Sequence, residues 1–434
     1  MTTNTTTAAT DTPARNPWTW IPSLYFGQGI PYVVVMTLSV VMYKNLEVSN
    51  TDIALYTSWL YLPWVIKPLW SPLVEMLGTK RRWIWALQFV IGAALALVAL
   101  TIPAPKFFQL TLAVFWLMAF ASASHDIAAD GFYMLALKQH QQAAFVGVRS
   151  TFYRLANIGG QGGLVYLAGE LQERTGSMTL AWSAVFWVLA ALFAAMAAYH
   201  LVMLPRPASD TLRRVEGSPV AEFFGVFAEF FKKPGILVIL GFLLLYRFPE
   251  AQLLKLASPF LLDKPEVGGL GLSTKEVGIA YGTVGLTALT LGGLAGGWVI
   301  SRIGLKRALW PLILAMHVPN IAFLALALWH PGNLWIISSA LAVEQFGYGL
   351  GFTAYLMYMI LVAEGPHKTA HYAICTGFMA LGMMLPGMWS GWLQDQIGYL
   401  WFFAWVLLCT LPSFAMTALI KVPEGFGKKD KAEA

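Results

Sequence analysis

The chain of 434 residues is strongly apolar, with 58% of its residues in the set Ala, Val, Ile, Leu, Met, Phe, Trp, Tyr and Cys and only 12% charged. Soluble domains are about 25% charged, so this composition excludes a water-soluble enzyme. The formal net charge of +6 does not indicate nucleic-acid binding, because the basic residues form short groups between apolar stretches, where Lys and Arg orient helices in a bilayer.

Twelve apolar runs are long enough to cross a bilayer, which takes about 20 residues. In chain order they are 18–44, 51–77, 82–104, 107–137, 143–170, 178–204, 235–262, 276–301, 305–330, 333–363, 369–393 and 398–421. The longest interruption, 205–234, is basic and contains Pro205, Pro207 and Pro219. We therefore expect an all-α membrane protein with six-helix bundles at 18–204 and 235–421, a linker at 205–234, and tails at 1–17 and 422–434.

The distribution of Lys and Arg predicts the orientation, because cytoplasmic loops retain positive charge. If both termini are cytoplasmic, the loops and tails on that side hold 18 basic residues and the opposite loops hold 5. The other five basic residues of the 28 lie inside the apolar runs. Charges at the centre of a bilayer are costly, so these five need partners, a water-filled cavity or a function.

The loop after the second run of each half has a similar pattern of Gly and basic residues. The residues of interest, to which we assign gating or structural roles, are Glu75, Gly78, Arg81, Arg302, Gly304 and Arg307. Any short cytoplasmic turn attracts Gly, Lys and Arg, but the position of the pair resembles the G-x-x-x-D-R-x-G-R-R loop of the major facilitator superfamily. Two residues depart from that pattern. Ser71 stands in place of the first Gly in the first copy of the loop, and Ser301 stands in place of the acid in the second copy. The resemblance implies two similar bundles with a solute site between them.

The fourth run carries two carboxylates one helical turn apart, Asp126 and Asp130, on the same face as Ser122 and Tyr133. Mutual repulsion and desolvation make the doubly ionised form unfavourable. The pair is therefore a candidate for proton exchange. The alternative is a structural salt bridge to a neighbouring helix, and both roles can coexist.

Further polar residues within the runs complete a candidate solute site. In the fifth run Arg154, facing the interior, is the expected partner of the carboxylates, while Arg149 is expected to extend toward the membrane surface. The predicted solute-binding residues are Lys67, His125, Tyr133, Arg154, Asn157, Gln161, Arg247, Glu250, Glu344 and Tyr348. With Lys255, the set contains nearly equal numbers of cations and carboxylates, which suits a polar or anionic solute.

Ser124-His125-Asp126-Ile-Ala-Ala-Asp130-Gly131 resembles the S-Q-D-I-A-x-D-x-W stretch of the peptide/acetyl-CoA/drug transporter branch of that superfamily, which includes the AmpG-type muropeptide permeases. The run Ile66-Lys67-Pro68-Leu69-Trp70, the pairs Tyr153-Arg154 and Tyr246-Arg247, and Glu344 are also similar to the AmpG-type pattern. His125 in place of Gln and Phe132 in place of Trp depart from it. The resemblance implies a monomeric, proton-driven importer of GlcNAc-anhydro-N-acetylmuramyl peptide in a bacterial inner membrane, with Asp126 and Asp130 as the coupling carboxylates.

Alternatives within the branch are siderophore or acyl-CoA transport, and proton antiport of drugs or metabolites is a further possibility. An enzyme using His125 as a base is the alternative from another class, although no nucleophile motif lies near it. The sequence has no P-loop, no dinucleotide fingerprint and no metal-ligand motif. We therefore expect no cofactor and no metal, with the proton gradient as the energy source.

Overall fold

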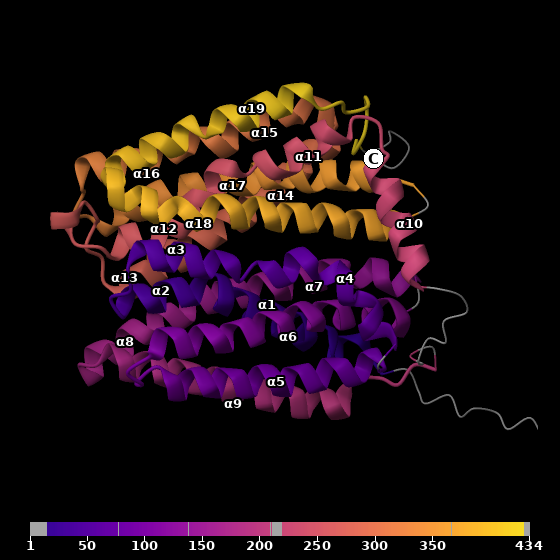
Figure 1. Ribbon diagram of the computed structural model, residues 1–434, viewed down its shortest axis with the longest axis horizontal. Coiled ribbons are helices and arrows are strands. Elements are labelled where there is room, and N and C mark those ends of the chain that lie inside the picture. The colour runs from indigo at the N-terminus through magenta and orange to yellow at the C-terminus, as the bar shows by residue number, and fades with distance from the viewer. Residues whose placement is uncertain are drawn as a thin grey trace, which may run out of the picture.

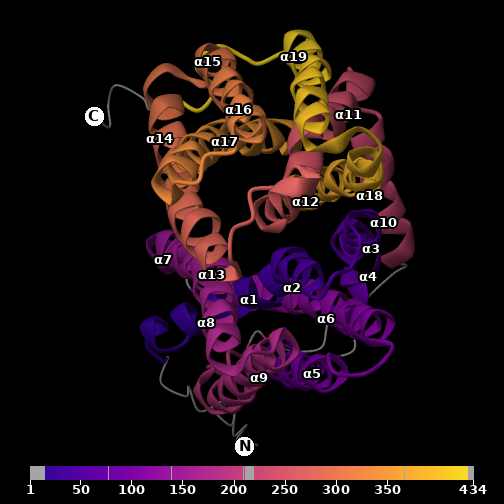
Figure 2. The ribbon, with the colours of Figure 1, turned by 90° about the vertical axis from the view of Figure 1, so that its left-hand side faces the viewer.

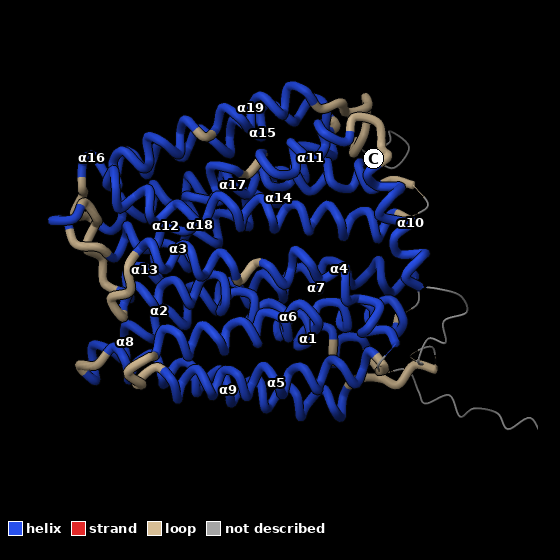
Figure 3. Tube along the Cα trace, viewed as in Figure 1, coloured by secondary structure: helices blue, strands red, loops and turns tan. Residues whose placement is uncertain are grey.

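The computed structural model describes residues 15–76, 78–137, 139–208, 210, 219–365 and 367–428. Among these residues the secondary structure is helical, without strands (Figure 3). The helices run side by side along the longest axis, and the chain enters and leaves at the same end (Figure 1). We call this end, which also carries α10, the terminal end, and the opposite one, with α8, α13 and α16, the far end.

The N-terminal half forms one bundle of six spans. Its helices are α1 (Ile21–Val33), α2 (Ser39–Asn45), α3 (Asn50–Trp59), α4 (Leu62–Met76), α5 (Lys80–Thr101), α6 (Phe107–Ala136), α7 (Gln139–Ile158), α8 (Val165–Thr175) and α9 (Met178–Met203). Wider π-helical turns at Val34–Leu38 and Gly159–Leu164 join α1 to α2 and α7 to α8. Side-chain caps begin several helices, because the first backbone N–H groups have no partner inside the helix; Ser49 caps α3 and Thr79 caps α5.

The C-terminal half forms a second bundle of six spans. Its helices are α11 (Ile236–Leu245), α12 (Phe248–Leu262), α13 (Thr274–Val277), α14 (Leu286–Ile303), α15 (Leu305–His317), α16 (Ile321–Trp329), α17 (Leu334–Ala363), α18 (Lys368–Leu408) and α19 (Thr410–Leu419). A π-helical stretch, Gly278–Gly285, joins α13 to α14. The chain turns within α18 at Gly398, whose φ of 73° suits glycine, so α18 contributes to two spans and α19 completes the second.

Nine stretches of the described chain are long and apolar enough to cross a membrane. One of them, Ala370–Leu419, contains the turn at Gly398 and therefore supplies two spans. The pairs α3–α4 and α7–α8 lie parallel to the others (Figure 1) but contain more polar residues. Together these make the twelve spans and the two bundles that the apolar runs predict, and Figure 2 shows the bundles one above the other.

The linker contains a helix that the sequence analysis did not anticipate, α10 (Pro219–Phe231), at the terminal end. Its Phe230 is fully buried and packs on Phe378 of α18, with the ring planes 12° apart. The linker is thereby attached to the C-terminal bundle. Residues 209 and 211–218, and both extreme tails, lie outside the described chain.

The two bundles are cross-linked mainly at the far end. Lys44 forms an ion pair with Asp263 at 2.6 Å, and Asp263 also accepts hydrogen bonds from Tyr399 at 2.6 Å and from Asn50 at 3.3 Å. Lys275 forms ion pairs with Glu170 at 2.7 Å and Glu173 at 3.3 Å. These contacts hold the two bundles together at the far end in this conformation.

Glycines allow the backbones of the two bundles to come into contact at the far end. A Cβ on Gly391 would lie 2.1 Å from the carbonyl oxygen of Asn50, and one on Gly169 would lie 2.6 Å from the backbone nitrogen of Lys275. Both distances are too short for a side chain, so α18 meets α3, and α8 meets α13, through glycine.

Candidate functional site between the bundles

Asp130 is paired with Arg149 rather than with Arg154. Arg149 Nη2 lies 2.8 Å from Asp130 Oδ1, its guanidinium lies 4.6 Å from the ring centroid of Tyr25, and the Tyr25 hydroxyl lies 3.4 Å from the same carboxylate oxygen. Tyr133 is the second ring beside Arg149, at 5.6 Å. The expectation that Arg149 extends to the membrane surface is therefore wrong. Because α7 begins at Gln139, Arg149 lies more than two turns inside the helix.

Asp126 accepts a hydrogen bond of 3.1 Å from the indole Nε1 of Trp64 on α4. The Trp64 ring meets Tyr32 of the first span edge to face, with centroids 5.3 Å apart. Tyr32 and Tyr61 interact with each other and lie close enough to Arg247 for a Coulombic interaction. A chain of aromatic side chains therefore connects Asp126 in one bundle to Arg247 in the other.

Arg247 lies at the break between α11 and α12, with φ −104° and ψ 21°. Its guanidinium donates a hydrogen bond to the Tyr348 hydroxyl and lies 4.8 Å from the ring centroid of Phe352. Arg247 Nε has no partner among the described residues, although the side chain is buried. A buried guanidinium with a free N–H is suited to an acceptor on a solute.

Arg154 connects the two bundles. Its Nη1 donates to the carbonyl oxygen of Thr290 on α14 at 3.2 Å. Asn157 donates to the carbonyl of Tyr153 in its own helix at 2.8 Å. Gln161 is buried where the π-helical turns of the fifth and eighth spans meet. A Cβ added to Gly282 would lie 2.3 Å from the backbone carbonyl oxygen of Gln161, so the two turns are in close contact. Arg154 and Gln161 thus lie at the contact between the bundles, while the amide of Asn157 is held by its own helix.

Two lysines of the predicted set have no carboxylate within ion-pair distance among the described residues. Lys67 of α4 is partly buried and is near enough to Asp126 for a Coulombic interaction. Lys255 of α12 is buried, donates to Thr57 of α3 at 2.9 Å and lies 5.2 Å from the ring centroid of Tyr61. Lys255 is therefore a contact between the bundles.

The structure corrects the predicted role of His125. Its Nε2 lies 3.1 Å from the amide nitrogen of Gln88, whose oxygen accepts a hydrogen bond from His200 Nδ1 at 2.7 Å, and His200 Nε2 lies 2.9 Å from the Ser23 hydroxyl. These residues lie inside the N-terminal bundle. One residue along a helix is a rotation of about 100°, so His125 faces α5 and α9 when Asp126 faces α4. The His125 side chain is therefore held inside the N-terminal bundle, away from the predicted solute site.

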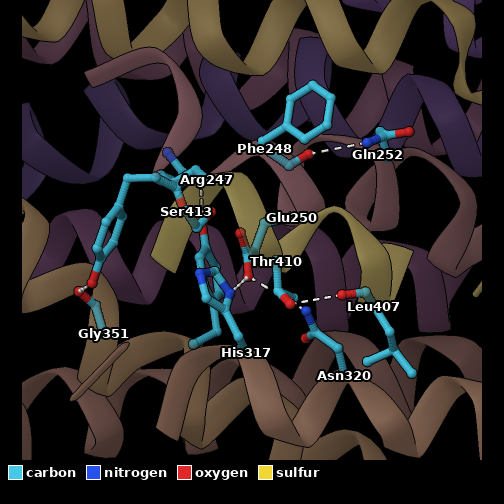
Figure 4. A network of polar contacts seen from close by, with 12 residues as sticks. Arg247, Phe248, Glu250, Gln252, His317, Asn320, Gly351, Leu407, Thr410 and Ser413 are labelled. Atoms are coloured by element: carbon cyan, nitrogen blue, oxygen red, sulfur yellow. Dashed lines mark hydrogen bonds and ion pairs between the residues drawn. The ribbon is translucent and has the colours of Figure 1, made fainter. Parts of the chain in front are cut away.

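Glu250 also lies inside its bundle rather than at a solute site. Its Oε1 lies 2.8 Å from Nδ1 of His317 and 3.5 Å from Nδ2 of Asn320 (Figure 4). Glu344 is buried as well and accepts a hydrogen bond of 2.8 Å from Gln345. Sequence reasoning missed His317, because a single histidine in an apolar run gives no signal before its neighbours in space are known.

The residues predicted to act in the loops lie at the terminal end. Arg81 donates to the carbonyl oxygens of Leu201 and Leu204, and the backbone nitrogens of Lys80 and Arg81 donate to Asp210 at 2.8 and 3.0 Å. In the second half Gly304 joins α14 to α15 with a backbone φ of 80°. The guanidinium of Arg302 lies 5.6 Å from the ring centroid of Trp298, and the Arg307 side chain is exposed. Gly78 packs beside Trp83, and the Glu75 side chain lies outside the described part of the chain.

Twelve spans in two bundles, with ionisable residues where the bundles meet, define a membrane transporter. The family model of the Major Facilitator Superfamily matches residues 23–363, and the chain belongs to that superfamily. The anhydromuropeptide permease of Escherichia coli strain K12 is 25% identical over 405 residues, which are 91% of this chain and 77% of the permease. The putative transporter AmpG 4 of Rickettsia conorii is 25% identical over 404 residues, covering 89% of this chain and 92% of the relative. Over most of its length the chain is thus similar in sequence to AmpG-type relatives.

Solved structures support the same fold. The nucleoside transporter NupG superposes with a TM-score of 0.67 at 18% identity, covering 93% of this chain and 99% of that one. A bacterial homologue of the human lysosomal transporter Spinster, in an inward-facing and unoccupied conformation, gives 0.63 at 16% identity, with 94% and 96% covered. At these identities the likeness concerns the fold.

Proposed function

We propose that this protein is a proton-coupled symporter that carries a muropeptide, GlcNAc-anhydroMurNAc peptide, inward across a bacterial inner membrane. The observation that carries the proposal is the pairing of Asp130 with Arg149 beside a bundle interface that also holds Asp126, Lys67, Arg154 and Arg247. The substrate class comes from the similarity to the anhydromuropeptide permease. The carboxylates of such a solute suit guanidinium and ammonium groups.

The geometry suggests how a proton and a solute are coupled. A proton on Asp130 removes the charge that holds Arg149, which lies on α7, and the same helix reaches α14 through Arg154. A ligand shifts a conformational equilibrium only by its differential affinity for the two states. Proton and solute therefore have to act on the same moving contact, and α7 provides it.

In this proposal both termini are cytoplasmic, so the sealed far end faces the periplasm and the described conformation faces inward. Alternating access then requires the far-end contacts of Lys44 and Lys275 to open while the terminal end closes. The proton gradient is the energy source, and neither a metal nor an organic cofactor enters the cycle. A monomer suffices, because each bundle supplies part of the site.

Uptake into proteoliposomes tests the proposal. With an inwardly directed proton gradient, the wild type should accumulate labelled GlcNAc-anhydroMurNAc peptide against its gradient, while Asp126→Asn and Asp130→Asn should only equilibrate it. Glu424→Gln is the matched control, because this exposed carboxylate pairs with Lys306 inside the C-terminal half, away from the proposed site and from the contacts between the bundles. Uphill accumulation by both site variants would contradict the coupling assignment.

The same preparation separates the alternatives. Uptake of a siderophore or an acyl-CoA without muropeptide uptake would contradict the proposed substrate but not the proposed coupling to protons. Extrusion of solute in exchange for protons would replace import by antiport.

A further inference from the structure

The break in the seventh span places a buried polar cluster inside the C-terminal bundle. Helix α11 ends at Leu245 and α12 begins at Phe248, so Glu250 lies in the first turn of α12. His317 is the last residue of α15, and Asn320 lies in the short turn that leads to α16. The carboxylate contacts both His317 and Asn320 (Figure 4). All three side chains are only 1% exposed.

Each member of this cluster has one further buried polar atom without a hydrogen-bond partner among the described residues. These atoms are Glu250 Oε2, His317 Nε2 and Asn320 Oδ1. When His317 carries its proton on Nδ1 and donates it to Glu250, all three free atoms are acceptors. A buried polar group without a partner is unfavourable, so a cluster with three surplus acceptors favours a ligand that supplies a proton and a positive charge.

The charges around the cluster point to the same ligand. The titratable groups from the neighbouring elements that lie close enough to Glu250 for a Coulombic interaction are Tyr246, Glu344, Tyr348 and Cys409. With the Glu250 carboxylate ionised and His317 neutral, the cluster itself carries one negative charge. Buried charges are normally paired, and one proton completes the balance.

The helix ends favour the charged forms. The positive end of the α12 dipole lies at its first turn, beside the Glu250 carboxylate, and the negative end of the α15 dipole lies at its last residue, His317. A carboxylate paired with an imidazolium is the arrangement that both dipoles stabilise. Arg247, three residues before Glu250, caps the same helix and lies near Tyr32 of the other bundle.

We infer that Glu250, His317 and Asn320 form a second proton-binding site, inside the C-terminal bundle and separate from Asp126 and Asp130. A hydronium ion supplies the proton: one of its O–H bonds breaks, an N–H bond forms at Nε2 of His317 and a water molecule is left. Release is the reverse step, with water accepting the proton, while Nδ1–H stays bonded to Glu250. No other bond is made or broken. Its role in coupling rests on the proposed function, whereas proton binding itself does not.

Infrared difference spectroscopy of the purified full-length protein, without solute, tests the site. A step in pH should produce imidazole and carboxylate bands, to which the other six histidines also contribute. The share of the imidazole signal that belongs to His317 should be lost in His317→Gln and reduced in Glu250→Gln. Asp126→Asn is the control and should retain the imidazole bands. His125→Gln is the second control, because His125 lies in the other bundle. An imidazole signal in His317→Gln as large as that of the wild type would overturn the inference, and Glu250→Gln, which is isosteric, decides the matter if His317→Gln does not fold.

Transport of GlcNAc-anhydroMurNAc peptide in proteoliposomes tests the coupling. His317→Gln should exchange solute for solute at near wild-type rates but lose about tenfold in uphill accumulation, within the usual range of coupling energies. Unchanged accumulation, or accumulation driven by a sodium gradient alone, would overturn the coupling role. If the wild type carries another solute, the proposed function fails while the infrared result still decides whether the site binds a proton.

Discussion

Asp263→Asn should shift the protein toward a conformation that is open at the far end. Asp263 belongs to the C-terminal bundle. Its carboxylate accepts hydrogen bonds from Lys44 and Asn50 of the N-terminal bundle and from Tyr399 of the C-terminal bundle. Removal of the charge weakens the contact with Lys44 without changing the shape of the side chain. The substitution therefore acts on a contact that exists only while the far end is sealed.

The size of the shift follows from the environment of the pair. Lys44 and Asp263 are each 16% exposed, so solvent screens them less than a surface pair. Hydrogen bonds to charged groups contribute about 1.5–3 kcal/mol. With a tenfold change for each 1.4 kcal/mol, the ratio of far-end-open to far-end-sealed molecules should rise by about 10-fold to 150-fold.

Electron–electron double resonance measures this ratio. Spin labels at Glu47 and Glu266, both exposed at the far end and on opposite bundles, report the separation of the bundles there. The matched control is Glu424→Gln, which breaks an ion pair of 3.1 Å with Lys306 inside the C-terminal half. An unchanged distance distribution in Asp263→Asn, or an equal change in the control, would refute the assignment of the far end as the seal.

Two further substitutions test the placement of the helices. His125→Leu should lower the free energy of unfolding by about 1–3 kcal/mol, because the Gln88 amide is left without a partner. The KM for solute should stay unchanged. A raised KM at unchanged stability would place His125 in the solute site instead. Gly282→Ala should abolish transport or folding, because its Cβ would lie 2.3 Å from a carbonyl oxygen of the fifth span, whereas Gly163→Ala, with nothing within 4 Å of its Cβ, should be tolerated. Equal transport rates for the two glycine variants would contradict the close packing.

The spans could be predicted from the sequence because their signal is local. A run of about 20 apolar residues is a property of the chain itself, and the helical repeat places Asp126 and Asp130 on one face without knowledge of their neighbours. The region around α7 gave a weaker signal. The start of the predicted run at 143 placed Arg149 near a helix end, whereas the helix begins at Gln139, and this error gave the carboxylates the wrong arginine.

The partners of these residues could not be predicted, because they depend on the rotation of each helix about its axis. Trp64 and His317 lie in apolar runs, where tryptophan and histidine usually pack in a core, and nothing local distinguishes a ligand from a core residue. His125 shows the opposite error, since its position next to Asp126 suggested a shared function although the two side chains face different helices. The linker helix α10 was missed for a similar reason, because charged and Pro-rich flanks concealed a short apolar stretch.

The irregular backbone explains why these contacts occur where they do. The first, fifth and eighth spans contain π-helical turns, and the seventh is broken at Arg247. Such turns leave backbone groups that neighbouring protein has to satisfy, which confines them to places covered by protein or water. The turns of the fifth and eighth spans meet through glycine, so the two bundles are in close contact where these helices are irregular. A rocking motion about this contact changes the surroundings of Arg154 on one side and of Lys275 on the other, which is the geometry that alternating access requires.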